Sequence, residues 1–271
     1  MLHVDFMHSD LLGVGGWLLA TALYEMAEEG AFGHFHGRWK DRLNLALFHA
    51  YRRFDDYCKQ NGIQHSQTTF ALNLLSLSSS QDWPSFKGKA HNVGVALDWL
   101  AVFVKQRPSA NNYGKMRDTA LLAHKRYHEV MHAAGPLFTQ AEAMSFFSHG
   151  LLFLQAYSLL ARHAQNQAVP HWCIKPKHHH LWHGFEEARL TGHNPKSFWL
   201  FKHEDFVGIA TRIGRLAHPA TISRSTLLSW VQHWSMKADA SEPVNRKHVM
   251  TTAPTRNRRR IKRIRRSAGP D

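Results

Sequence analysis

Apolar residues recur every three or four positions along most of this chain, which predicts a mainly α-helical fold. The clearest stripe predicts a buried face on a helix over about 91–105 and consists of Val93, Leu97, Leu100 and Val104. The same spacing predicts further helices over 11–29, 39–58, 114–133 and 140–163, and later ones within 206–216 and 227–234. Strand signals are few, and they predict at most two or three short strands, near 2–8 and 196–202.

The helix after Thr139 has the clearest start signal. Glu142 follows Thr139 by three residues, which is the pattern of a capping box. The apolar face predicted for this helix consists of Met144, Phe147, Leu151 and Leu154. The widest apolar faces belong to the segments 11–29, 91–105 and 140–163. We therefore expect the first to pack against the other two, with Trp17 and Phe147 largely inaccessible.

Charge is concentrated at one end of the chain. The net charge of the 271 residues is +14, from 34 Lys or Arg and 20 acids. Residues 246–271 hold ten of the basic residues and one acid, so the other 245 residues hold 24 basic and 19 acidic ones. The apolar pattern stops after Ala238. We therefore expect a body over 1–238 and a disordered, arginine-rich tail over 239–271.

The tail is suited to nucleic acid or to a nuclear import receptor. Dense positive charge binds phosphates without reading sequence and also matches nuclear localisation signals. The candidate nucleic-acid-binding residues of the tail are Arg256, Arg258, Arg259, Arg260, Lys262, Arg263, Arg265 and Arg266. This composition predicts a nuclear protein, or otherwise a cytoplasmic one, that binds DNA or another nucleic acid.

Cysteine usage and hydropathy favour a soluble protein in a reducing compartment. Cys58 and Cys173 are too few for a disulfide framework. The first ten residues contain two acids and no Lys or Arg, which is unlike a secretory signal. The longest apolar stretch, over 11–24, contains three glycines and is shorter than the roughly 20 residues of a membrane span. We expect no membrane association.

The N-terminal residues form a candidate metal-binding motif. A short extended segment would bring Asp5 and His8 to its end, and a carboxylate held there is well placed to bind a metal ion. From the residues alone, the role of a helix-capping or surface acid is favoured for Asp5 over that of a metal ligand.

Two segments of the chain resemble a known family. Residues 5–14, DFMHSDLLGV, resemble the segment around the second catalytic aspartate of CACTA- and Plavaka-like eukaryotic DDE transposases. Residues 175–183, KPKHHHLWH, and 201–208, FKHEDFVG, are similar to the closing part of the same enzymes. The resemblance implies an incomplete RNase H-like domain, with a helical insertion bundle over 11–170 and a closing segment over 171–238.

The resemblance also implies a chemistry and its residues. Asp5 and Glu204 would be catalytic ligands of Mg²⁺ in two-metal phosphoryl transfer, and they should lie close together. His8, Lys177, His179 and His183 would support the site as a structural or phosphate-facing patch, and Arg215 would face DNA. The family's first catalytic aspartate lies upstream of the position of Asp5. We therefore expect a transposase-derived fragment that is inactive alone.

Two other functions remain open from the residues. One is a non-catalytic helical protein that binds nucleic acid, in which Asp5 and Glu204 are ordinary surface acids. The other is a zinc-dependent hydrolase, because His179 and His183 share a helical face and have neighbours in His178 and His180. Histidine is common throughout this chain, with 22 residues that include two within 127–132, and no Glu lies between His179 and His183. We therefore do not expect zinc at this cluster.

Overall fold

The computed structural model of the chain describes residues 5–199, 211–212, 214–215 and 221–241. The chain divides into two compact units, Met1–Phe206 and Val207–Asp271. In the first unit the elements are α1 (Phe6–Ser9), the π-helical segment η1 (Asp10–Val14), α2 (Gly15–Glu28), α3 (Trp39–Gln60), α4 (Ala90–Gln106), α5 (Asn112–Ala133), α6 (Gln140–Asn166), α7 (Pro176–Thr191) and the 3₁₀ helix η2 (Pro195–Phe198). The second unit contains α9 (Ile222–Ser241). The prediction of a mainly helical chain is confirmed.

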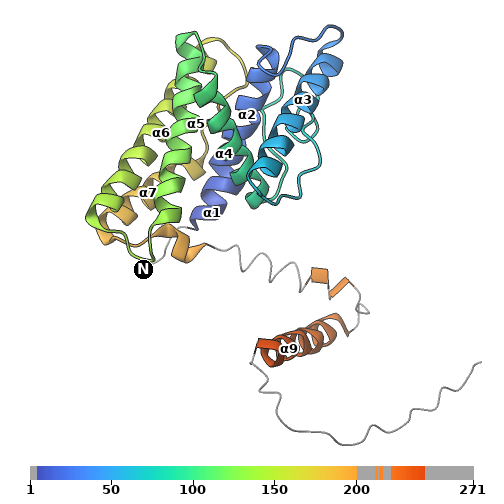
Figure 1. The fold of residues 1–271 in the computed structure, drawn as a ribbon, viewed down its shortest axis with the longest axis vertical. Helices are drawn as coiled ribbons and strands as arrows, with labels where there is room; N and C mark the ends of the chain where they lie inside the picture. The colour runs from blue at the N-terminus through green and yellow to red at the C-terminus, as the bar shows by residue number, and fades with distance from the viewer. Residues whose placement is uncertain (1–4, 200–210, 213, 216–220, 242–271) are drawn as a thin grey trace, which may run out of the picture. The chain divides into compact units, whose positions relative to one another are not determined.

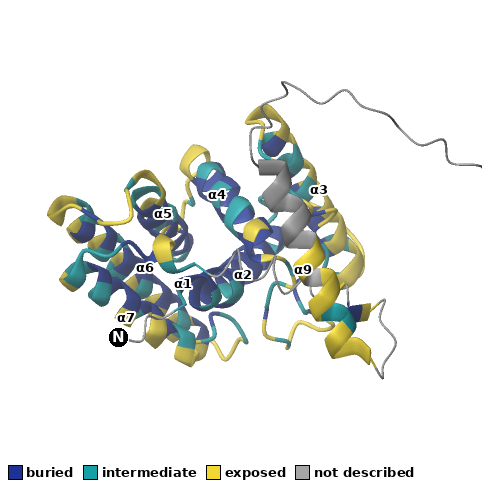
Figure 2. Cartoon of the chain, turned by 90° about the horizontal axis from the view of Figure 1, so that it is seen from below, coloured by how far each residue is buried: buried dark blue, intermediate teal, exposed yellow. Residues whose placement is uncertain are grey.

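The first unit is a bundle in which α2 is central (Figure 1). Almost every residue of α2 is buried, and the helix packs against α3 on one side and α4 on the other. The neighbouring pairs α4–α5, α5–α6 and α6–α7 continue the bundle. The burial pattern agrees, since the inward faces of these helices are buried while their outer faces are exposed (Figure 2).

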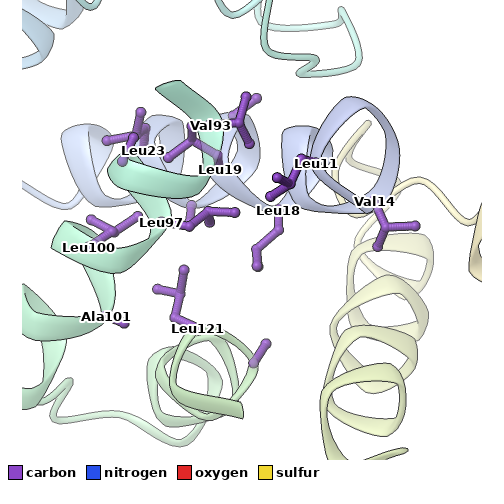
Figure 3. Packing of buried hydrophobic residues seen from close by; sticks show 14 of the residues in the cluster. Leu11, Val14, Leu18, Leu19, Leu23, Val93, Leu97, Leu100, Ala101 and Leu121 are labelled. Atoms are coloured by element: carbon purple, nitrogen blue, oxygen red, sulfur yellow. The ribbon is translucent and has the colours of Figure 1, made fainter. Parts of the chain in front are cut away.

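The predicted contact between the first helix and the helix near 91–105 is confirmed. Figure 3 shows this contact, in which apolar side chains of η1 and α2 meet those of α4. All four residues of the predicted α4 stripe are buried. In contrast, α6 makes its main contacts with α5 and α7 rather than with α2.

The buried face of α6 lies one residue away from the predicted one. The buried positions are Ala143, Phe146, Gly150, Phe153, Ala156, Tyr157, Leu160 and Ala164. Met144 is 46% exposed, whereas Phe147 and Trp17, which we expected to be largely inaccessible, are partly buried and pack against the core. The reason is that α6 is apolar on several sides, and two alternative stripes both have helical spacing.

The described residues contain no strand, only an isolated bridge between Leu137 and His193. Residues 6–8 of the expected strand near 2–8 are helical, because the Asp5 carboxylate accepts a hydrogen bond from the Met7 amide and caps α1. In the other expected strand, near 196–202, residues up to Phe198 are 3₁₀-helical and follow a cap by Asn194. Residues 200–202 lie outside the described part.

Helix α9 extends to Ser241 and so includes the first three residues of the expected tail. The structure does not describe 242–271, so the predictions for the arginine tail lie outside its range. One described helix, α6, is long and apolar enough to cross a membrane by length and composition. This is weak evidence, because core helices pass the same test and α6 packs against two neighbours.

Candidate functional site

The N-terminal motif forms a small hydrogen-bonded turn. Asp5 Oδ1 accepts from the Met7 amide at 3.2 Å, and Asp5 Oδ2 pairs with His8 Nδ1. Both oxygens of this carboxylate are therefore engaged locally. Asp5 has the role of a helix cap, which was one of the two roles that the residues alone allowed.

The N-terminal turn packs against the start of α7, more than 160 residues away in the sequence. Lys177 Nζ donates to the backbone oxygens of His8 at 2.9 Å and Leu12 at 3.1 Å. A Cβ at Gly13 would lie 2.5 Å from Lys177 Cδ, so glycine allows this close approach. Of the predicted site residues, the structure thus brings together Asp5, His8 and Lys177.

Electrostatics and bonding give Lys177 a structural role. Burial lowers the pKa of Lys177, nearby Asp5 opposes this effect, and Lys175 adds to it. Its two backbone acceptors lie in α1 and in η1, on either side of the junction between them, and η1 is irregular at Gly13. Lys177 therefore stabilises this junction.

The other predicted residues lie elsewhere or outside the described range. His179 and His183 are exposed on α7, with their Nε2 atoms 2.9 Å apart. Arg215 is exposed in the second unit. Glu204 lies outside the described residues, so its expected proximity to Asp5 stays a prediction.

A different cluster of metal-ligating side chains lies at the centre of the first unit. Asp10, at the start of η1, is completely buried, and it faces His124 and His128 of α5. Asp10 Oδ1 lies 3.0 Å from His124 Nε2, and Asp10 Oδ2 lies 2.6 Å from His128 Nε2. Among the described residues, this is the group of three that could hold a metal ion, with one ligand atom of each residue within 4.8 Å of the others.

The local sequence explains how three side chains converge on one point. His124 and His128 are four residues apart on α5, so both project from one helical face. Their rings stack with centroids 4.5 Å apart. Between them in the sequence, the Tyr127 hydroxyl donates to Asp10 Oδ2 at 3.0 Å. The carboxylate therefore has three partners from one helix.

The electrostatics keep Asp10 ionised despite its burial. Burial alone would raise the pKa of Asp10, but the charges and hydrogen bonds of His124 and His128 together hold it well below its usual range. Burial lowers the pKa of His124, and Asp10 opposes that effect. Burial also raises the pKa of Tyr127, reinforced by Asp10, so this hydroxyl remains a donor.

The cluster borders a cavity of about 560 Å³. His124 and His128 form part of its wall, together with His132 and Trp199. The His132 ring lies against both His128 and Trp199, with centroid distances of 5.9 and 5.3 Å. The cluster thus has a buried carboxylate on one side and an open space on the other.

Sequence reasoning did not select Asp10, His124 or His128 as a site. The available signal was the His-x-x-x-His spacing on a helix, which is a weak signal in a chain with 22 histidines. The carboxylate that completes the group precedes His124 by 114 positions. Comparisons of the chain with protein-family models, curated proteins and solved structures give no match.

Proposed function

We propose that this chain is a transposase-like protein that binds nucleic acid and does not cut DNA by itself. The observation that carries the proposal is the contact between two segments that resemble DDE transposases. The segments 5–14 and 175–183 are far apart in the sequence. They are in contact in the structure, because Lys177 of the second segment donates to the backbone oxygens of His8 and Leu12 in the first. A resemblance by chance would not require these segments to meet.

The charge distribution supports nucleic acid as the partner. The tail combines eight Arg or Lys within residues 256–266, and the rest of the chain is also mildly basic. Each phosphate that a cationic side chain neutralises releases a counterion, which makes binding favourable and dependent on salt. Arg215, exposed on the second unit, adds a further cationic group.

The described part of the N-terminal corner does not fit Mg²⁺. This ion prefers several oxygen ligands in octahedral geometry. The corner offers Asp5, whose two oxygens already bind the Met7 amide and His8, and the Lys177 ammonium lies nearby. No group of three metal-ligating side chains occurs there among the described residues. We therefore derive no catalytic step through Mg²⁺.

The proposal predicts salt-dependent DNA binding through the tail. The test compares the full chain with a variant in which the eight basic residues at 256–266 are changed to Gln, by fluorescence anisotropy at several salt concentrations. We expect weaker binding and a shallower plot of log affinity against log salt, by up to about 7 in slope if all eight contact phosphates. A control with Lys at the seven arginine positions should keep the slope. An unchanged slope in the Gln variant would place the binding elsewhere.

A plasmid-nicking assay in Mg²⁺ and in Mn²⁺ tests the absence of cutting. We expect no nicking by the parent chain or by Glu204→Gln, because phosphoryl transfer of this class needs two precisely held ions. Nicking by the parent that Glu204→Gln abolishes would contradict this expectation.

A further inference from the structure

We propose that Asp10, His124 and His128 bind one divalent transition-metal ion, for which Zn²⁺ is the best match. This site goes beyond the proposed function and does not depend on it. Its ligands lie on η1 and α5 and include neither Asp5, Lys177 nor any residue of the tail. The site is argued from contacts that the proposed function does not use.

The cluster brings one ligand atom of each residue within 4.8 Å of the others, close enough to converge on one ion. Zinc binds imidazole nitrogen and carboxylate oxygen at about 2.0–2.2 Å, so two ligands of one tetrahedral ion lie roughly 3–3.5 Å apart. The separations between Asp10 oxygens and histidine Nε2 atoms are 3.0 and 2.6 Å. Both values are at or below the lower end of that range, so an ion would enter by replacing the two hydrogen bonds and moving the histidines slightly away from Asp10. Each imidazole would then bind the ion through Nε2 and carry its proton on Nδ1.

The chemistry of the donors selects the class of metal. Two imidazole nitrogens and one carboxylate oxygen suit zinc and its neighbours in the first transition row, whereas Mg²⁺ and Ca²⁺ prefer oxygen ligands. The Asp10 carboxylate lies in a wholly buried position. A divalent cation beside it would compensate a negative charge there directly.

Surrounding groups would hold the ligands in place. Tyr127 donates to Asp10 Oδ2 at 3.0 Å and would fix the orientation of the carboxylate, as outer partners of metal ligands commonly do. A Cβ at Gly15 would lie 2.9 Å from Asp10 Oδ1 and 3.2 Å from His124 Nε2. Glycine at this position therefore leaves room for the cluster.

Three protein ligands leave a coordination position open. Structural zinc sites have four protein ligands, and sites with three ligands keep the fourth position for water or substrate. His124 and His128 border the cavity of about 560 Å³, which gives that position a path to small molecules. The occupant expected there is water or a small anion.

The alternative is a hydrogen-bonded network without metal, in which Asp10 is satisfied by His124, His128 and Tyr127. Metal titration of the full chain, purified without a histidine tag and stripped with a chelator, separates the two. We expect one Co²⁺ per chain with visible absorption bands of a low-symmetry site, displaced by Zn²⁺. Thermal unfolding of the same samples should shift to higher temperature with Zn²⁺.

Substitutions locate the binding to this cluster. His128→Ala should weaken Co²⁺ binding by more than about 100-fold, and Tyr127→Phe should weaken it by about 10–100-fold, the usual effect of losing an outer partner. The matched control is His183→Ala, which removes one member of the exposed pair with the same spacing and should leave the tight site intact. The titration of the parent chain provides a test that does not depend on the folding of any variant.

Two results would overturn the proposal. One is the absence of tight, one-to-one binding by the parent chain. The other is tight binding that His183→Ala removes and His128→Ala does not. Failure of DNA binding would leave this site untouched, because the two assays share no residue.

Discussion

Single buried polar residues tie the helices of the first unit together. Glu25 of α2 is buried, and its Oε1 accepts from the Tyr113 hydroxyl at 2.6 Å, Trp172 Nε1 at 2.8 Å and His171 Nδ1 at 2.9 Å. Its Oε2 accepts from the buried Arg117 at 3.2 Å. A buried carboxylate is tolerated only with such a complete set of donors. The network therefore specifies how α2, α5 and the segment before α7 pack.

His178 allows a prediction about pH at the same scale. Burial lowers its pKa from 6.5 to about 4. The backbone hydrogen bond with Lys175 raises the pKa slightly, and the charge of Lys175 lowers it slightly. The unfolded chain therefore binds this proton in the pH window from about 6.5 down to 4, and the folded chain does not. Stability is lost as pH falls through that window. His178→Gln lacks this titrating group, so it should not lose that part of its stability. When the pH falls from 7.5 to 4, the free energy of unfolding of the variant minus that of the parent should rise by up to about 3 kcal/mol.

Urea unfolding at several pH values measures this difference. The control is His183→Gln, which removes an exposed histidine from the same helix. Parallel pH curves for the parent and His178→Gln would contradict the prediction.

Between elements, the contact of α6 with α7 depends on one small residue. A Cβ at Gly150 would lie 2.5 Å from two ring atoms of Phe185 on α7, closer than packed atoms approach. Phe185 is buried and also contacts Phe146 and Tyr127. Glycine at this position therefore sets the distance between the two helices.

Gly150→Ala should destabilise the chain by about 1–2 kcal/mol in chemical unfolding. Overpacking of a core costs about 1–3 kcal/mol, and the better helix propensity of alanine returns up to about 1 kcal/mol. The control is Gly135→Ala in the α5–α6 loop, where a Cβ would have no neighbour within 4 Å. That change should stay within about 0.5 kcal/mol of the parent. A stabilising effect of Gly150→Ala would contradict this prediction, because it would mean that α6 and α7 are far enough apart to accept a methyl group at position 150.

At the scale of the whole molecule, the buried apolar core lies within the first unit. Its members among the described residues run from Phe6 to Ala188. Just after them, the buried Asn194 donates to the backbone oxygens of Met131 and Gly135, each at 2.9 Å. These bonds attach the segment after α7 to the end of α5.

A chain that ends at Phe206 should therefore unfold cooperatively, with a free energy of unfolding within about 1 kcal/mol of the full chain. Far-UV circular dichroism during urea unfolding measures this value. A chain that ends at Gly192 loses Asn194 and removes the donor from the buried Met131 carbonyl and from the Gly135 carbonyl, which should cost about 1–3 kcal/mol. Equal stabilities of the two shortened chains would show that Asn194 contributes little.

The sequence by itself determined the helices, because hydrophobic periodicity and capping are local properties. The α4 stripe and the capping box at Thr139 appear in the structure as predicted. Local patterns could not select the buried face of α6, because apolar residues lie on several of its sides and only its neighbours decide which are covered. They also could not distinguish a strand from a helix at the capping Asp5.

Only the tertiary structure decided which polar residues meet. Lys177 reaches the N-terminal turn across 169 positions, and His128 reaches Asp10 across 118. A residue pattern carries information about neighbours within a few turns, whereas these contacts follow from how α5 and α7 pack on the N-terminal helices. For this reason the sequence indicated an acid at position 5 as the candidate ligand, whereas in the structure the group that could hold a metal ion surrounds the acid at position 10.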